Sequence, residues 1–364
     1  MGKPCFSPLK IERRIAMFDF INLQLFATLS NGANATVASG SMGAGPANAE
    51  LSVENKTYYD MTLIDEAQAQ LVHDQFGQKR PIPANGGKTI EFRKFHSYEK
   101  ALTPLQEGVT PAGKAIKVTA ITSTVDQYGD YTMLSDVLDL TSIDNVVLET
   151  TKNHGRQAGM TLDTVTRNVL QSGTNVTYCP SIAAPTTEIT SRSTLKADSQ
   201  LTVDVIMQVV AKLRAVNAPT INGKYVAIIH PYVAYDLMRD PEWIDAHKYS
   251  AVSNLFEGEI GEIAGVRFVQ TSEARIYTGE GCPSDLAVFG TLFLADGAYG
   301  VTEITGGGLQ TIVKQKGSAG TADPLDQRST VGWKAIKTAE ILIQDYIVRV
   351  ESCSSKFSKT ATAN

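Results

Sequence analysis

The sequence predicts an α+β fold, and three parts of the chain lead to this prediction. Residues 142–171 carry apolar side chains at helical spacing over a length unusual for a small domain. Residues 88–95 and 115–133 have alternating apolar positions on either side of a loop rich in glycine and proline, which is typical of a β-hairpin. Residues 198–305 alternate between apolar strands and amphipathic helices. We therefore expect a long helix, a projecting hairpin and a second α/β unit.

Length and composition are those of an ordinary globular protein. The chain has 364 residues, of which 43% are hydrophobic and 20% charged, and a formal net charge of −5. This length suffices for roughly two or three domains. The mild acidity argues against a sequence-specific nucleic-acid binder, which normally presents a basic face. The cysteines are too widely spaced for a CxxC pair, so we expect unpaired thiols in a reducing compartment: Cys5, Cys179, Cys282 and Cys353.

Residues 1–50 are predicted to form an extended arm. Residues 30–48 are mostly Gly, Ala, Ser and Asn, which bury too little apolar area to fold alone, so a partner is expected to order them. A basic cluster precedes the apolar run 15–27, and residues 33–35 are similar to a signal-peptidase site. Polar residues interrupt this run, and it is too short to span a membrane. We therefore expect neither a signal peptide nor a membrane anchor.

A helix is predicted over about 53–76. Pro81 and Pro83 stop it, and its apolar face consists of Val53, Met61, Ile64, Leu71 and Val72.

The predicted hairpin follows this helix. Ile90 and Phe92 alternate on its first arm, and Ile116, Val118 and Ala120 alternate on its second. A loop of about 19 residues, rich in turn formers, joins the two arms. A long two-stranded hairpin is marginally stable in isolation, so this one is expected to project and to lie on a neighbouring molecule.

The long helix at 142–171 is predicted to be the spine of the fold. Thr141 is expected to cap its N-terminus with Asp144 in the capping-box position, and Gly173 to end it in a left-handed conformation. Such a rod would be about 45 Å long. Gly155 and Gly159 would let another backbone approach closely. The buried stripe is expected to be Ile143, Val147, His154, Ala158, Leu162, Val165 and Val169.

The remaining segments are assigned by the same patterns. A loop-rich excursion is expected at 174–197 and a glycine-rich linker at 306–323, and the polar last dozen residues are expected to fray. Helices are predicted at 203–216 and 231–239. Strands are predicted at 224–230, 266–271, 286–294 and within 331–350.

Two glycine-rich segments resemble phosphate-binding loops without completing the pattern. Residues 108–115 have Ala115 where a P-loop needs a hydroxyl for Mg²⁺, and Pro111 lies inside the loop. Residues 86–89 have the hydroxyl but Ile82 where the first glycine belongs. A hairpin loop is the better interpretation of both.

Other candidate chemistry is equally sparse. The five histidines include no pair at helical metal-ligand spacing, and His230 is interpreted as structural. The SxxK patterns at 97–100 and 193–196 lack the partner motifs of a nucleophile. An acidic run could bind a cation, although a solvated helix face is the simpler account: Asp236, Asp240, Glu242 and Asp245. We therefore predict no enzyme activity, no cofactor and no metal.

Four segments, in order, resemble one known family. They are Phe18-Asp-Phe-Ile-Asn-Leu-Gln-Leu-Phe-Ala27; Tyr225-Val-Ala-Ile-Ile-His-Pro231 followed by Tyr235-Asp-Leu; Glu259-Ile-Gly-Glu-Ile-Ala-Gly-Val-Arg-Phe268; and Asp323-Pro-Leu-Asp-Gln-Arg-Ser-Thr-Val-Gly-Trp-Lys334 continuing to Asp345-Tyr-Ile-Val-Arg-Val-Glu351. These segments are similar to the major capsid (coat) proteins of tailed bacteriophages, in particular the N4-like coat family. The first resembles an N-terminus that starts at Met17, so residues 1–16 are interpreted as a possible extension.

The resemblance implies the tailed-phage major capsid protein fold. That fold has an N-terminal arm, a projecting β-hairpin called the E-loop, a peripheral domain with a long spine helix, and an axial α/β domain. The implied division is arm 1–50, leading helix 51–78, E-loop hairpin 79–132, peripheral domain 133–197 and its return 306–351, axial domain 198–305, and tail 352–364.

The resemblance also implies a function and partners. The chain would self-assemble through pentameric and hexameric capsomers into an icosahedral shell around double-stranded DNA, which it would contact non-specifically. The arm is too short to act as a built-in scaffold, so a separate scaffolding protein is expected, together with a portal and possibly a cement or decoration protein. Assembly would take place in the host bacterial cytoplasm, with no membrane involved. Some relatives crosslink a hairpin lysine, and Lys94, Lys100 and Lys114 occupy that region.

We hypothesise that apolar residues of the arm and the hairpin pack on adjacent subunits. From the arm these are Phe18, Phe20, Leu25 and Phe26; from the hairpin they are Phe95, Tyr98, Leu102, Leu105 and Val109. Two alternatives stay open at this point. A secreted, self-associating adhesin or surface protein would share the β-arms but needs a working signal peptide. A hydrolase or nucleotide-dependent enzyme would need the incomplete motifs above to be functional.

Overall fold

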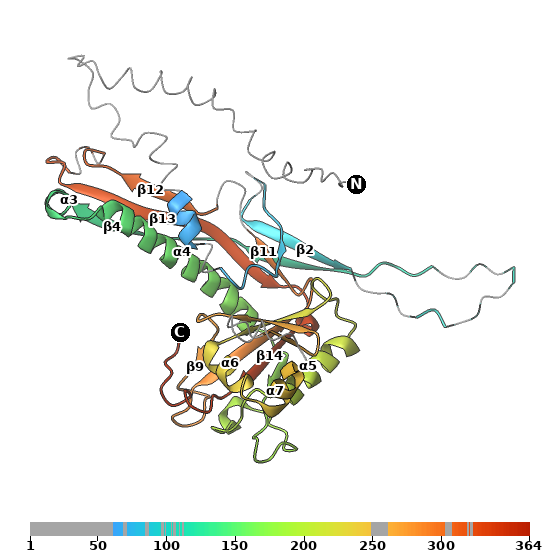
Figure 1. Ribbon diagram of the computed structural model, residues 1–364. Coiled ribbons are helices and arrows are strands. Elements are labelled where there is room, and N and C mark those ends of the chain that lie inside the picture. Colours follow the sequence, from blue (N-terminus) through green and yellow to red (C-terminus); the bar gives the residue numbers. More distant parts are fainter. Residues whose placement is uncertain are drawn as a thin grey trace, which may run out of the picture.

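The computed structural model describes residues 61–67, 71–83, 87–95, 98, 100–102, 104, 107–108, 110, 113–248, 261–302, 308–318, 320 and 323–364. Figure 1 shows an elongated unit, in which a long helix lies along a narrow sheet, and a compact unit below one end of it. This arrangement confirms the predicted α+β class. It also confirms the combination of a spine helix, a projecting hairpin and a second α/β unit.

Strand β13, Arg328–Ile341, is the central strand of the elongated unit. On one edge it pairs antiparallel with β4, Asp126–Ser135. On the other edge it pairs with β12, Gln310–Lys314, and with β11, Tyr299–Thr302, which in turn pairs with β1, Gln78–Lys79. Trp333 and Ala335 of β13 pack against Ala158 and Leu162 of the spine helix, which gives this unit its own small core.

The spine helix α4, Val146–Gln171, begins later than predicted. Asn145 caps it through a hydrogen bond from the Leu148 N–H, 3.1 Å, because a separate short helix, α3, Asp136–Thr141, precedes it. Ile143, which we expected on the buried stripe, is fully exposed. The expected left-handed stop at Gly173 is also wrong, since the cap residue Ser172 is right-handed and Gly173 has no positive φ.

The segment before the hairpin is helical only over 61–67 among the described residues, and residues 71–76, where the helix was expected to continue, are irregular with a turn at 73–76. Its buried side chains are Leu63 and Ala67, whereas the predicted Met61 is exposed. The predicted close approach at Gly155 is confirmed. A Cβ atom there would lie 2.8 Å from the Leu63 carbonyl oxygen, so only glycine lets this segment lie directly on α4.

The second arm of the hairpin divides into two strands. Strand β2, Thr89–Phe95, pairs with β3, Val118–Thr124, while β4 turns away at Val125 and joins β13. The hairpin is therefore shorter than the span from 88 to 133 suggested. The segment 306–323, expected to be only a linker, contains β12.

The compact unit is built on a seven-stranded sheet in the order β5-β14-β10-β6-β8-β7, with β9 beside β10. Its strands are β5 Val176–Tyr178, β6 Tyr225–Ile229, β7 Glu262–Ile263, β8 Val266–Gln270, β9 Ile276–Tyr277, β10 Val288–Leu294 and β14 Ile347–Ser352. One face is covered by helices α5 Val203–Ala215, α6 Pro231–Leu237 and α7 Pro241–Lys248. Helices α5 and α6 and strands β6, β8, β10 and β14 match predicted elements to within a few residues, whereas β5, β7, β9 and α7 were not predicted.

The last residues are docked, which corrects the expectation that they fray. Cys353 and Ser358 are buried, and Ser354 and Ser355 donate hydrogen bonds to the Asp236 carboxylate. The side chain of Asn364 accepts from the Ile276 N–H, 3.0 Å. Polar side chains fill these sites, so a hydrophobicity pattern could not reveal them.

In the described part of the chain, the backbone passes between the two units three times: from α4 to β5, from β10 to β11 and from β13 to β14. A separate apolar cluster lies where these passages converge, and it includes Leu170, Leu292, Tyr299 and Ile347. The two units are therefore joined by packed side chains as well as by the backbone.

Candidate assembly surfaces

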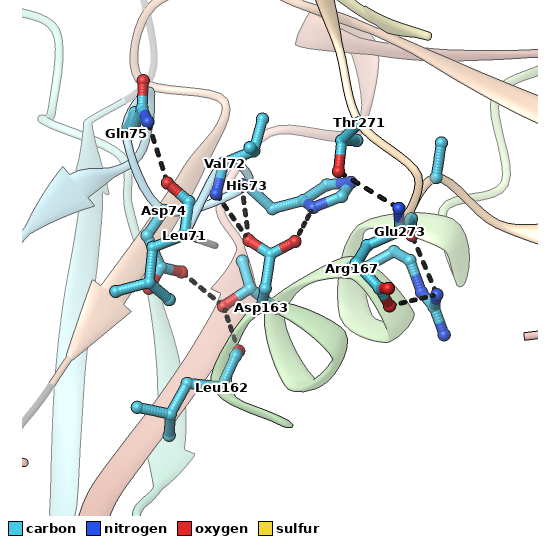
Figure 2. Close-up of polar contacts among 12 residues, drawn as sticks. Leu71, Val72, His73, Asp74, Gln75, Leu162, Asp163, Arg167, Thr271 and Glu273 are labelled. Atoms are coloured by element: carbon cyan, nitrogen blue, oxygen red, sulfur yellow. Dashed lines mark hydrogen bonds and ion pairs between the residues drawn. The ribbon is translucent and has the colours of Figure 1, made fainter. Parts of the chain in front are cut away.

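A buried polar cluster positions the hairpin base on the spine helix. The Asp163 carboxylate on α4 accepts hydrogen bonds from the Val72 and His73 N–H groups, 2.9 and 2.7 Å, and lies 2.6 Å from His73 Nδ1. Figure 2 shows Asp163 pointing from its helix toward the turn that carries these residues. The Asp163 and His73 side chains are fully buried. Because a carboxylate oxygen accepts, His73 is assigned the tautomer with hydrogen on Nδ1.

Two further residues extend this cluster to the sheet. Asp74 accepts from Thr166 Oγ1, 2.6 Å, and pairs with Lys337 of β13. The Tyr299 hydroxyl donates to the His73 carbonyl, and burial raises the pKa of Tyr299 well above its ordinary value. The turn before the hairpin is thus bonded to the helix, to β13 and to β11, so the base of the hairpin has a fixed direction.

Among its described residues, the hairpin is anchored to the rest of the subunit at its base. Phe92 is buried against Gly300, where a Cβ atom would lie 2.7 Å from the Phe92 ring, and Ser123 Oγ lies 3.0 Å from Thr338 Oγ1. Beyond the base, every described residue from 113 to 120 is exposed. Figure 1 shows the hairpin extending away from the body of the subunit.

The structure describes only some of the predicted contact residues. Tyr98 and Leu102 are exposed, Leu102 by 82%. Phe95 is the last residue of β2, and its side chain lies outside the description. The remaining six lie outside the described residues: Phe18, Phe20, Leu25, Phe26, Leu105 and Val109. Sequence reasoning did not include the exposed Ile116 and Val118 among the contact residues, because their alternation was used only to predict a strand.

A second apolar surface, also missed, lies at the opposite end of the elongated unit. Helix α3 has no buried residue, although Ser135 caps it by accepting from the Leu138 N–H at 3.2 Å. A short helix that buries nothing is not stable alone, so a partner surface is expected to cover it. The exposed apolar side chains at this end are Tyr131, Met133, Val137, Leu138, Leu140, Ile143 and Leu325.

The candidate chemical motifs have structural roles. The Asp236 carboxylate accepts hydrogen bonds from the C-terminal serines. Asp240 accepts from the Val203 and Glu242 N–H groups at 3.0 Å. The expectation that this acidic run is a solvated helix face is therefore wrong for Asp236 and Asp240. Lys114 of the P-loop-like segment is exposed and leads into β3, not into a helix.

Among the described residues, no group of three or more His, Cys, Asp or Glu side chains is arranged to hold a metal ion. No helix in the described part of the chain is long and apolar enough to cross a membrane.

His230 is structural, as predicted, and it makes the compact unit sensitive to acid. Its Nδ1 accepts from the Tyr232 N–H, 3.1 Å, at the start of α6, and burial lowers its pKa from 6.5 to about 4. Between pH 6.5 and pH 4 the unfolded chain therefore binds a proton that the folded chain does not. Stability should fall with falling pH across this window, by up to about 3 kcal/mol, and this contribution should not change further below it.

Replacing His230 with Asn tests this expectation. Asparagine keeps an N-cap acceptor but does not titrate, so the His230→Asn variant should lose less stability than the parent between pH 6.5 and pH 4. Urea unfolding of the unassembled subunit at each pH gives the difference. Parallel pH profiles for the two proteins would contradict the assignment.

The shape and the sequence both match known capsid proteins. The asymmetric unit of the cyanophage Pam1 capsid has a TM-score of 0.62 at 13% identity, with 88% of this chain and 100% of that chain covered. The capsid of Ralstonia phage GP4 gives 0.59 at 14% identity, covering 88% and 99%. The capsid of the cyanophage P-SCSP1u gives 0.58 at 14% identity, covering 77% and 87%. No curated protein matches the sequence.

These likenesses define the class of the protein as one with the tailed-phage capsid fold, and at such low identity they show the fold alone. The family follows from the sequence, because the profile of the phage capsid proteins matches residues 118–346, well over half of the chain. The chain belongs to the phage capsid protein family, and its function is to form the capsid shell. The N4-like subgroup stays a prediction.

Proposed function

We propose that this chain forms pentameric and hexameric capsomers of an icosahedral shell, and that the hairpin joins neighbouring subunits within them. The observation that supports this most directly is the exposed distal hairpin. Tyr98, Leu102, Ile116 and Val118 present apolar side chains to solvent on a ribbon with little core of its own. Covering them requires a second molecule, and in a closed ring that molecule is another copy of the chain.

The domain assignment is proposed accordingly. Residues 79–132 act as the E-loop, and residues 133–197 with 306–341 act as the peripheral domain. The compact unit takes the axial position: β5 and β14 join it because both strands pair within its sheet, and β11, Tyr299–Thr302, is left to the peripheral domain because it pairs with β13. The arm 1–50 extends to neighbours through Phe18, Phe20, Leu25 and Phe26.

The remaining partners and the absence of catalysis are proposed on the family relationship. A separate scaffolding protein and a portal direct assembly in the host cytoplasm, a cement protein can bind the finished shell, and the double-stranded DNA inside is contacted non-specifically. The role is structural and not enzymatic. The structural use of Asp236, Asp240 and His230 supports this proposal.

Removing the distal hairpin tests the proposal. A variant in which residues 98–112 are replaced by a short Gly-Ser linker should fold, because the base of the hairpin is anchored separately at Phe92 and Ser123. It should form no shells when it is expressed with its scaffolding protein. Circular dichroism of the subunit and electron microscopy of the particles give the two readouts.

A second variant removes the apolar contacts of the hairpin without changing its length. Leu102→Gln with Ile116→Gln should change the stability of the free subunit by no more than about 0.5 kcal/mol, since both side chains are exposed. It should nevertheless lower shell yield strongly. The matched control is Ile182→Gln with Met207→Gln, two exposed apolar residues of the compact unit. Normal shells from the hairpin deletion would overturn the E-loop assignment.

A further inference from the structure

The last residues of the chain connect the two units of the subunit. The C-terminal segment, residues 353–364, starts on the compact unit, where Cys353 and Ser358 are buried. Figure 1 shows this segment running along the side of the compact unit toward α4. Between Ser358 and Asn364 its residues are exposed, apart from the partly buried Ala361. The far end of the segment is therefore held mainly by the contacts of Asn364 itself.

The Asn364 side chain is bonded to the loop that leads from β8 into β9. Its Oδ1 accepts from the Ile276 N–H, 3.0 Å, and its Nδ2 donates to the carbonyls of Ala274 and Ser272, 2.9 and 3.3 Å. An asparagine side chain has one acceptor oxygen and two N–H donors. The hydrogen-bonding groups of the loop backbone thus match those of Asn364 in number and in kind.

Two arginines bind the main-chain oxygen of Asn364. Arg167 of α4 donates to it from Nη2 at 3.3 Å, and Arg275 of the loop donates from Nη1. The Arg167 side chain is 1% exposed, and it also donates to the Glu273 carbonyl at 2.8 Å, as Figure 2 shows. Burial and the nearby charge of Arg275 lower the pKa of Arg167, so an acceptor oxygen shared by the two guanidinium groups stabilises their charged forms. We call the residues around Asn364 the socket: Arg167, Arg275 and the backbone of 272–276.

The socket attaches the spine helix to the compact unit at a second point. Gln171, the last residue of α4, donates to the Gly290 carbonyl at 3.2 Å and accepts from the Tyr277 hydroxyl at 3.0 Å. Arg167 lies one turn earlier in the same helix, and it binds the loop that Asn364 holds in place. A helix attached at its end can tilt about that end, and a further attachment one turn away opposes the tilt.

We propose that the C-terminal segment is a latch: Asn364 docks in the socket and thereby fixes the angle between the spine helix and the compact unit. This inference rests on the proposed function, because a chain that builds both pentamers and hexamers needs a defined range of this angle to close a shell. Asn364 is exposed and is held by hydrogen bonds, so the latch can open without unfolding either unit. A subunit whose latch is open should form closed shells less often.

Two substitutions open the latch from opposite sides. Asn364→Ala removes the three side-chain hydrogen bonds, and Arg275→Ala removes one of the two donors to the main-chain oxygen. In the free subunit, hydrogen exchange of the Ile276 amide should become about tenfold faster in Asn364→Ala, because the substitution removes the acceptor of this N–H group. The matched control is Thr362→Ala, an exposed residue of the same segment, which should leave the exchange rate unchanged.

Electron microscopy of shells formed with the scaffolding protein tests the role of the latch in assembly. Asn364→Ala and Arg275→Ala should each lower the fraction of closed shells by about fivefold or more, in favour of open or irregularly curved particles. The double variant should be little worse than either single variant, because both substitutions act on the same docking. Thermal unfolding of each free subunit should stay close to that of the parent, which shows that the defect lies in assembly and not in folding.

The outcomes separate this inference from the proposed function. Unchanged exchange of the Ile276 amide in Asn364→Ala would show that Asn364 does not hold the socket. Faster exchange together with a normal fraction of closed shells would show that docking does not fix the angle. Either result overturns the latch and leaves the proposed function standing. The proposed function fails separately, if the variant without residues 98–112 still forms normal shells.

Discussion

Asp163→Ala should lower the free energy of unfolding of the elongated unit by about 4 kcal/mol. The substitution removes the acceptor for three buried donors, the His73 ring and the N–H groups of Val72 and His73, and each stranded donor costs about 1–3 kcal/mol. Water cannot replace the carboxylate easily, because the side chains of Asp163 and His73 are both fully buried. Asp163→Asn keeps one oxygen for the backbone donors, so its loss should be about half as large.

The tryptophans make this loss measurable in one unit at a time. The chain has two, Trp333 in the core of the elongated unit and Trp243 in the compact unit. In a Trp243→Phe background, the fluorescence of Trp333 during urea unfolding reports on the elongated unit. The control is Glu149→Ala on the same helix, an exposed ion pair with Lys152 whose loss should cost no more than about 0.5 kcal/mol. Equal effects of Asp163→Ala and Glu149→Ala would show that the buried cluster contributes no more to the free energy of unfolding than an exposed ion pair does.

Glu351→Ala should destabilise the compact unit by about 3–5 kcal/mol. Glu351 lies on β14 with its side chain fully buried, and Arg192 donates two hydrogen bonds to it, 2.7 and 2.6 Å. Arg349 lies 2.9 Å from the same carboxylate. The pair raises the pKa of Arg192 further above its ordinary range, so removal of the carboxylate leaves charged guanidinium groups next to the core.

Substitution of Arg192 tests whether Arg192 and Glu351 stabilise the compact unit as a pair or as two independent side chains. Arg192→Ala leaves Glu351 with Arg349 as its remaining partner, and the double variant Arg192→Ala/Glu351→Ala should be less destabilised than the sum of the single variants. Trp243 fluorescence in a Trp333→Phe background reads the compact unit. High salt should leave the coupling between the two residues almost unchanged, because buried pairs are weakly screened. Strictly additive losses would mean that the two residues do not act together.

Sequence patterns predicted the fold well wherever one face of an element is apolar and buried. Strands β6 and β10 and helix α5 are of this kind, and their predicted ends are close to the observed ones. The start of the spine helix was misplaced because Ile143 continues the helical spacing although it is exposed. A pattern records that a residue is apolar and cannot record what covers it. The break between β3 and β4 depends on pairing with β13, about 200 residues later, which no local pattern contains.

The candidate assembly surfaces were only half predictable for the same reason. Tyr98 and Leu102 were identified because their loop is too rich in turn formers to build a core. Val137, Leu138 and Leu140 were missed, because no element was predicted between the hairpin and the spine helix, where the structure has α3.

The three passages of the backbone between the units have a mechanical consequence. Strand β14 lies inside the sheet of the compact unit, while β13, the strand before it in the chain, is the central strand of the elongated sheet. Hence no continuous fragment of the chain contains one unit complete without part of the other, and a single proteolytic cut between them would not release one from the other. A pull on the hairpin reaches the compact unit along the chain through α4 and β5, and it also reaches the link from β13 to β14 through the hydrogen bonds between β4 and β13. The described part of the two units is therefore expected to bear tension as one stiff piece.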